Sequence, residues 1–134
     1  MAANFTKWFP SGFRLINGLT LTNWFNIPQV SVEDGIVATA GGNQATAYKL
    51  TAAQSRIKTC ATNGDSVALP PAIVGSRFVV INDGVATCQV YGSGTDTIDA
   101  VATATGVTVS NAKRAFFFCE AAGLWQSLGG SKAS

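Results

Sequence analysis

The chain has 134 residues, of which 47 % are hydrophobic and 12 % are charged. This length suits one domain with a single core, and the low charge excludes a disordered polyelectrolyte or a coiled coil. Nine basic and seven acidic residues give a net charge of +2 without a dense basic block, so we expect no nucleic-acid partner. No run reaches the roughly 18 apolar residues of a membrane span, so we expect no membrane partner either. The N-terminus lacks a compact apolar signal core, which predicts synthesis in the cytoplasm.

The first 35 residues are rich in aromatic side chains and are predicted to form an extended N-terminal arm. Six aromatic residues fall within the first 25 positions, among 13 in the whole chain. They could form a small core of their own, or dock into pockets of a partner or neighbouring copy, where large aromatic side chains contribute most of the binding energy. We favour docking, and the candidate anchors are Trp8, Phe9, Phe13, Trp24 and Phe25.

Residues 36–128 are predicted to form an all-β domain, and residues 129–134 a flexible C-terminal tail. Short runs of β-branched and apolar residues alternate with turn signals such as Asn63-Gly64-Asp65 and Gly92-Ser93-Gly94. The expected strands are 36–40, 45–50, 56–61, 66–69, 77–82, 85–91, 96–99, 107–110, 114–120 and 124–128. Many short strands with regular turns favour an antiparallel β-sandwich or a small β-barrel. The recurring Ala-Thr pairs have no fixed spacing, so no repeat architecture is predicted.

Two turns are predicted in more detail. Asn82-Asp83-Gly84 lies between two β-branched runs and predicts a hairpin over residues 77–91, because such residues tolerate the positive φ angles of tight turns. Leu69-Pro70-Pro71 cannot lie in a central strand, because proline has no amide hydrogen to donate to the ladder. This stretch is therefore predicted to leave one strand and turn a corner before Gly75 begins the next.

The three cysteines, Cys60, Cys88 and Cys119, are widely spaced and do not form a CxxC pair. We interpret them as buried free thiols, with a Cys88–Cys119 disulfide as the alternative. Zinc sites usually need four ligands, and the chain has no histidine, so we expect no metal site.

No catalytic residue or cofactor is predicted from the sequence. The absence of histidine removes the commonest general base. Asp96 and Asp99 are three residues apart, so on a strand they would point to opposite faces and could not share an acid-base site. We expect them to cap loops, with calcium binding as an alternative. Lys113-Arg114 precedes Phe116-Phe117-Phe118, which we interpret as a buried core strand rather than a surface for single-stranded nucleic acid.

Two stretches, "NGDSVALPPAIVGSRFVVINDGVATCQVYGSGTDTIDA" (63–100) and "GVTVSNAKRAFFFCEAAGLWQSL" (106–128), resemble a β-rich module of tailed-bacteriophage virion proteins. "GFRLINGLTLTNWFN" (12–26) is similar to the opening segment of such proteins. The resemblance implies a virion location but does not choose between capsid decoration proteins, head fibres and tail fibres. The chain is short for a fibre with a shaft, which favours decoration.

The expected function is therefore that of a phage capsid decoration or cement protein without enzymatic activity. Its expected partners are the major capsid protein and further copies of itself, as a trimer or dimer. Its expected location is the capsid surface, after assembly in the host cytoplasm. The alternative is a fibre or receptor-binding module that contacts the host through loops 62–65 and 92–97.

Overall fold

The computed structural model describes residues 30–129 and 131–132, and this part of the chain is all β. The strands are β1 (Val32–Val37), β2 (Tyr48–Lys49), β3 (Gln54–Thr59), β4 (Ser66–Ala68), β5 (Arg77–Asn82), β6 (Cys88–Tyr91), β7 (Thr97–Ile98), β8 (Val107–Val109), β9 (Lys113–Ala121), β10 (Leu124–Leu128) and β11 (Ser131–Lys132). The all-β prediction is therefore confirmed, and the expected strands overlap most of those observed.

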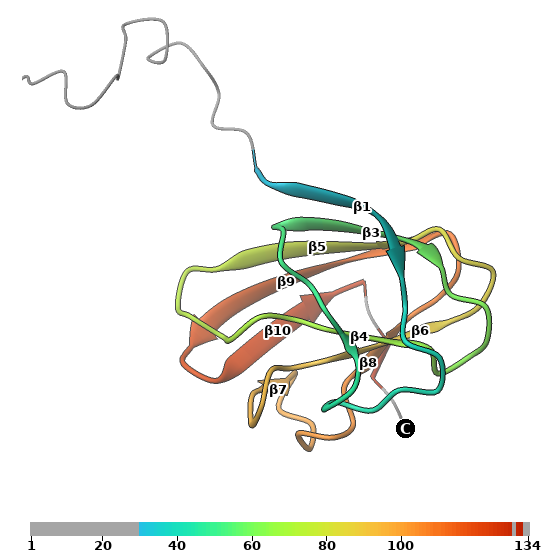
Figure 1. Ribbon diagram of the computed structural model, residues 1–134. Helices are drawn as coiled ribbons and strands as arrows, with labels where there is room; N and C mark the ends of the chain where they lie inside the picture. Colours follow the sequence, from blue (N-terminus) through green and yellow to red (C-terminus); the bar gives the residue numbers. More distant parts are fainter. Residues whose placement is uncertain (1–29, 130, 133–134) are drawn as a thin grey trace, which may run out of the picture.

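The strands form two sheets that share one core (Figure 1). The six-stranded sheet has the order β1-β3-β5-β9-β10-β7, and the five-stranded sheet has the order β11-β8-β6-β4-β2. From β1 to β9 the chain changes sheet at every strand. Neighbours within a sheet are therefore mostly distant in sequence.

The first six strands wind as three successive rungs, β1 with β2, β3 with β4, and β5 with β6. Corresponding strands of successive rungs pair in parallel, in a β-solenoid-like arrangement. Tyr48 is thus the register partner of Val67, and Gln54 that of Val79, one rung further along the chain in each case. Both sheets are consequently mixed rather than antiparallel, which corrects that part of the prediction. The winding was not visible in the sequence because its rungs share a similar length and not a motif.

The predicted hairpin over residues 77–91 is wrong. β5 pairs with β3 and β9, whereas β6 pairs with β4 and β8 in the other sheet. Asn82-Asp83-Gly84 therefore carries the chain from one sheet to the other. Gly84 is needed there for space, because a Cβ atom at this position would lie 2.5 Å from the Cβ of Cys60.

Asn82 holds this crossover from within the core. Its side chain is fully buried, and its amide nitrogen donates hydrogen bonds of 2.8 Å to the carbonyl oxygens of Ala86 and Val109. Its amide oxygen accepts a 3.0 Å bond from the Gly84 N–H. All the polar atoms of this buried amide are thereby engaged, which fixes the path between the sheets.

The predicted corner at Leu69-Pro70-Pro71 is confirmed. It links β4 of the five-stranded sheet to β5 of the six-stranded sheet. Leu69 is buried, and the Pro70 carbonyl accepts a 3.3 Å hydrogen bond from Nε1 of Trp125. Gly75 has a φ of +88°, which favours glycine, and its N–H donates to the Cys119 carbonyl oxygen.

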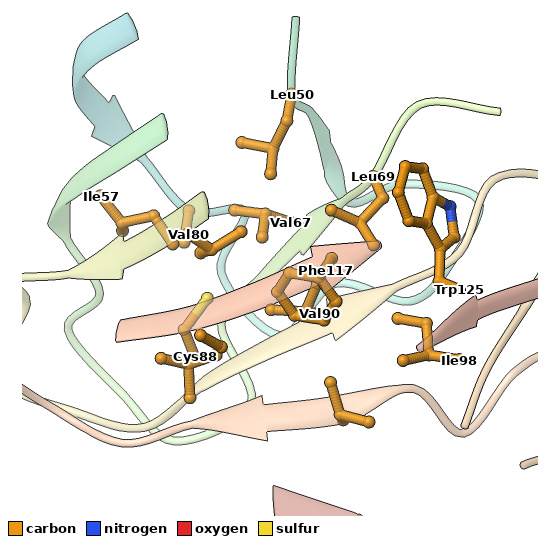
Figure 2. Close-up of a cluster of buried hydrophobic side chains, with 14 of the residues drawn as sticks. Leu50, Ile57, Val67, Leu69, Val80, Cys88, Val90, Ile98, Phe117 and Trp125 are labelled. Carbon is orange, nitrogen blue, oxygen red and sulfur yellow. The ribbon is translucent and has the colours of Figure 1, made fainter. Parts of the chain in front are cut away.

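Side chains from both sheets fill the core (Figure 2). Trp125 and Phe117 are the largest fully buried side chains. The ring of Trp125 meets that of Phe78 edge to face, with centroids 5.7 Å apart, an arrangement favoured by the ring quadrupoles. The aliphatic part of the core comprises Leu50, Ile57, Val67, Leu69, Val80, Val90, Ile98, Val107 and Val109.

Both expected boundaries of the β domain fall within its sheets. The boundary after residue 35 lies inside β1, which pairs with β3 from Val32 onward. Residues 131–132, expected in the tail, form β11 and pair with β8. β1 and β11 extend beyond the predicted boundaries for the same reason. Their backbone groups pair with a neighbouring strand, and such pairing does not require an apolar sequence pattern.

Candidate interaction surface

The five predicted docking residues, Trp8, Phe9, Phe13, Trp24 and Phe25, lie outside the described residues. The described part presents a different apolar surface, on the outer side of the six-stranded sheet. Phe116 is 54 % exposed and Leu128 is 68 % exposed, and the two residues are register partners on β9 and β10. We call these two residues, with the half-buried Phe118 and Val79 beside them, the outer apolar patch.

The outer apolar patch follows from the alternation of β9. Ala115, Phe117 and Cys119 point into the core and are buried. Phe116 and Phe118 therefore point outward. The prediction that all three phenylalanines are buried is confirmed for Phe117 and is wrong for Phe116, whereas Phe118 is half-buried. The sequence did contain the signal, because Phe116 and Phe118 share their parity with the charged residues Arg114 and Glu120.

The outer apolar patch surrounds an open hollow of about 350 Å³, lined by Arg77, Phe116, Phe117, Phe118 and Leu128. Val79 of β5 is the register partner of Phe116 on the side away from Leu128. Apolar side chains from three adjacent strands thus lie in one row. A contiguous exposed apolar surface of this kind is typical of a site of protein contact.

Unpaired positive charge borders the outer apolar patch. Arg77 is the register partner of Phe118, and Arg114 lies two residues before Phe116. Both arginines are exposed, and neither makes an ion pair within the described part of the chain. Arg56, by contrast, makes a 2.5 Å contact with Asp83 and a 3.7 Å contact with Asp34. Glu120, exposed on the same face of β9 two residues after Phe118, adds one carboxylate, so the border carries two arginines and one acidic group. The arginine side of the border suits acidic groups of a partner around an apolar centre.

No protein-family model, curated protein or solved structure matches the chain. The chemistry of the described surface and core therefore carries the functional argument.

Asp96 and Asp99 act as caps, as predicted. Asp96 accepts a 2.7 Å hydrogen bond from the N–H of Ala72. Asp99 accepts a 2.7 Å bond from the N–H of Ser127 through one carboxylate oxygen and a 2.5 Å bond from its hydroxyl through the other. Between residues 30 and 132, no three His, Cys, Asp or Glu side chains are placed to hold a metal ion.

The cysteines are buried free thiols, as predicted. Cys60, Cys88 and Cys119 are all reduced and lie in the core, so the alternative disulfide is not formed. Burial raises the pKa of both Cys60 and Cys88, because the apolar surroundings disfavour the thiolate. The neutral form behaves as a small apolar side chain.

Within the described residues no helix is long and apolar enough to span a membrane.

A second hollow, of about 360 Å³, lies beside loop 92–97 and is lined by Asn43, Gln44, Ala45, Lys49, Gly94 and Ala104. Its polar groups are engaged within the protein. Gln44 donates to the Gly92 carbonyl, Lys49 donates to the Gln44 carbonyl, and Asn43 accepts from the N–H of Ala45. These bonds hold the loop in place and leave few groups to recognise a glycan.

Loop 62–65 is held in a similar way by Asp65, whose side chain is buried. One carboxylate oxygen accepts hydrogen bonds from the N–H groups of Ala61, at 2.7 Å, and Thr62, at 3.0 Å. The other accepts from the Thr62 hydroxyl at 2.7 Å. The Thr62 hydroxyl and these N–H groups lower the pKa of Asp65 from 3.8 to about 2. The ionised carboxylate therefore stabilises the folded loop.

Replacement of Asp65 by Asn should weaken the acid dependence of stability. Because the pKa is lowered on folding, the stabilisation is present above pH 3.8 and is lost as the pH falls towards about 2. The wild-type melting temperature should drop more steeply between these pH values than that of Asp65→Asn. Thermal unfolding followed by circular dichroism measures both, with Asp34→Asn, at an exposed position, as the control. Equal slopes for wild type and Asp65→Asn would contradict this role.

Proposed function

We propose that this protein is a non-enzymatic structural component of a tailed-phage virion that decorates and stabilises the capsid by binding the assembled lattice of the major capsid protein. The observation that carries the proposal is the outer apolar patch, where Phe116 and Leu128 lie exposed side by side between Arg77 and Arg114. The two-sheet core supplies a rigid support for this patch.

Binding through this patch would stabilise the capsid by mass action. A protein that binds the assembled lattice and not its free subunits shifts the equilibrium towards the assembled form. Repeated copies at symmetric positions strengthen a contact that is weak for one copy, and favour a trimer or dimer of this chain. Trp8 and Phe9 remain proposed anchors that would add to the contact, and assembly would occur in the host cytoplasm.

The alternative function is that of a fibre or receptor-binding module. It places the contact in loops 62–65 and 92–97. The described contacts favour it less, because Asp65, Asp96 and Gln44 already use their polar atoms to hold these loops.

Co-sedimentation of the purified full chain with intact particles of the source phage tests the proposal. We expect wild type to pellet with assembled capsids and not with free capsid subunits. The double variant Phe116→Asp with Leu128→Asp should lose this binding, because it places carboxylates in the apolar contact. Val85→Asp is the matched control, since Val85 is 80 % exposed and lies away from the patch.

Gold-labelled antibodies on intact particles, viewed by electron microscopy, separate the two functions. Label over the whole head supports decoration. Label confined to the tail tip or to a few fibres would overturn decoration and support the receptor-binding alternative. Equal capsid binding by the double variant and by Val85→Asp would remove the outer apolar patch from the contact.

A further inference from the structure

β1 differs from the other strands that border the two sheets. Within residues 30–129 and 131–132, the border strands are β1 and β7 in one sheet and β2 and β11 in the other. β2, β7 and β11 have two residues each, whereas β1 has six. Proteins usually keep border strands short, because unpaired backbone groups attract another strand. β1 is therefore the border best suited to accept one (Figure 1).

The side chains around β1 point to the same conclusion. Val30, Val32 and Val37 are each about 60 % exposed, so this end of the winding presents apolar side chains as well as backbone groups. The start of β1 is fixed against β3, because the Ser31 carbonyl accepts a 3.0 Å bond from the N–H of Gln54. The opposite side of β1 has no strand in the described part of the chain.

The charge and length of the preceding residues fit this open side. β1 carries Glu33 and Asp34, and the Asp34 side chain is exposed. Residues 1–29 contain Lys7 and Arg14 and no acidic residue. One rung carries the chain from Val32 of β1 to its register partner Gln54 of β3, and a rung of the same length before β1 would begin near residue 10. The segment has the length that such a rung needs.

We infer that residues 10–29 of the same chain cover the open side of β1 and extend the winding by one rung, with residues near 10–16 parallel to β1. Phe13 and Leu15 share one face of an extended segment and would lie over the core end at Ile36. Arg14 would then lie on the outer face, where Asp34 lies. Phe13, Trp24 and Phe25 become parts of this rung, and Trp8 and Phe9 remain for docking. The inference does not depend on the proposed function.

Hydrogen exchange of the full chain, followed by mass spectrometry or NMR, tests this inference. The pairing of β1 with β3 is shifted between Glu33 and Ile36 and again between Ile36 and Val37, so the open-side amides are those that do not donate to β3, and these depend on the new rung for protection. In wild type we expect all β1 amides to be protected like those of β3. In the variant Phe13→Asp with Leu15→Asp, the open-side amides should exchange at least about tenfold faster, because local opening becomes easier. Trp8→Asp, which lies outside the rung, should leave them unchanged.

Three outcomes would overturn the inference. Open-side β1 amides of wild type that exchange as fast as an unstructured peptide would show that nothing covers them, and this result needs no variant. Protection that survives Phe13→Asp with Leu15→Asp would exclude these residues. Protection that is lost on dilution by about 100-fold would assign the cover to a second copy. The amides of β3 and β5 report in the same experiment whether each variant is folded.

Discussion

Replacement of Phe117 by alanine should lower the free energy of unfolding by about 3–5 kcal/mol, the usual cost of removing a buried aromatic ring. Phe117 is 1 % exposed and lies at the centre of the core, between the two sheets. Truncation removes its contacts and leaves a cavity that the strands around it can fill only in part. This loss is a large share of the about 5–15 kcal/mol that stabilises a typical domain.

Phe116→Ala is the matched control for Phe117→Ala. It makes the same chemical change one residue away, but Phe116 points out of the sheet and is 54 % exposed. We expect a change of about 0.5 kcal/mol or less, as for most surface substitutions. Urea denaturation of both variants measures the difference. Similar losses for the two would show that the assigned alternation of β9 is wrong.

Replacement of Asn82 by aspartate should cost about 3–5 kcal/mol at neutral pH, the range for a buried charge without a partner. The change keeps the shape of the side chain, but an oxygen replaces the nitrogen that donates to the Ala86 and Val109 carbonyls. The new carboxylate would face two carbonyl oxygens in a fully buried site. Burial and these oxygens should raise its pKa above the unfolded value of about 4.

The raised pKa gives Asn82→Asp a pH dependence that can be measured. For an acid whose pKa rises on folding, the variant is best tolerated below about pH 4, where the carboxyl is neutral in both states. The penalty should grow as the pH rises through the folded pKa. Denaturation at several pH values measures the penalty relative to wild type. Asn82→Ala, which loses the hydrogen bonds without adding a charge, should show no such trend, and a penalty independent of pH in Asn82→Asp would contradict the assigned contacts.

The positions of the strands could be predicted from the sequence, but their partners could not. β5 and β10 were predicted with their observed bounds, and β4, β7, β8 and β9 within one residue at either end. Strand position depends on local alternation and turn residues, which the sequence displays. Pairing depends mostly on contacts between segments that are distant in the sequence, and Asn82-Asp83-Gly84 suits a crossover between sheets as well as a hairpin.

The outer apolar patch could be predicted only in part. The position of Phe116 follows from the parity that it shares with Arg114 and Glu120. Leu128 is different, because it lies next to Phe116 only through the β9–β10 pairing. The arginine border likewise depends on the pairing of β5 with β9, which brings Arg77 beside Phe118 from a distant part of the sequence. The predicted anchors at residues 8–25 lie outside the described part of the chain.

The alternation of the chain between its two sheets has a consequence for folding during synthesis. Among the described strand pairs, β9 with β10 is a local hairpin, and the others join strands that do not follow one another in the sequence. Folds with such a high contact order fold slowly. β5 acquires its antiparallel partner, β9, only after residue 121 has been made. We therefore expect the nascent chain to remain without a complete core until β9 and β10 have left the ribosome, and to depend on chaperones until then.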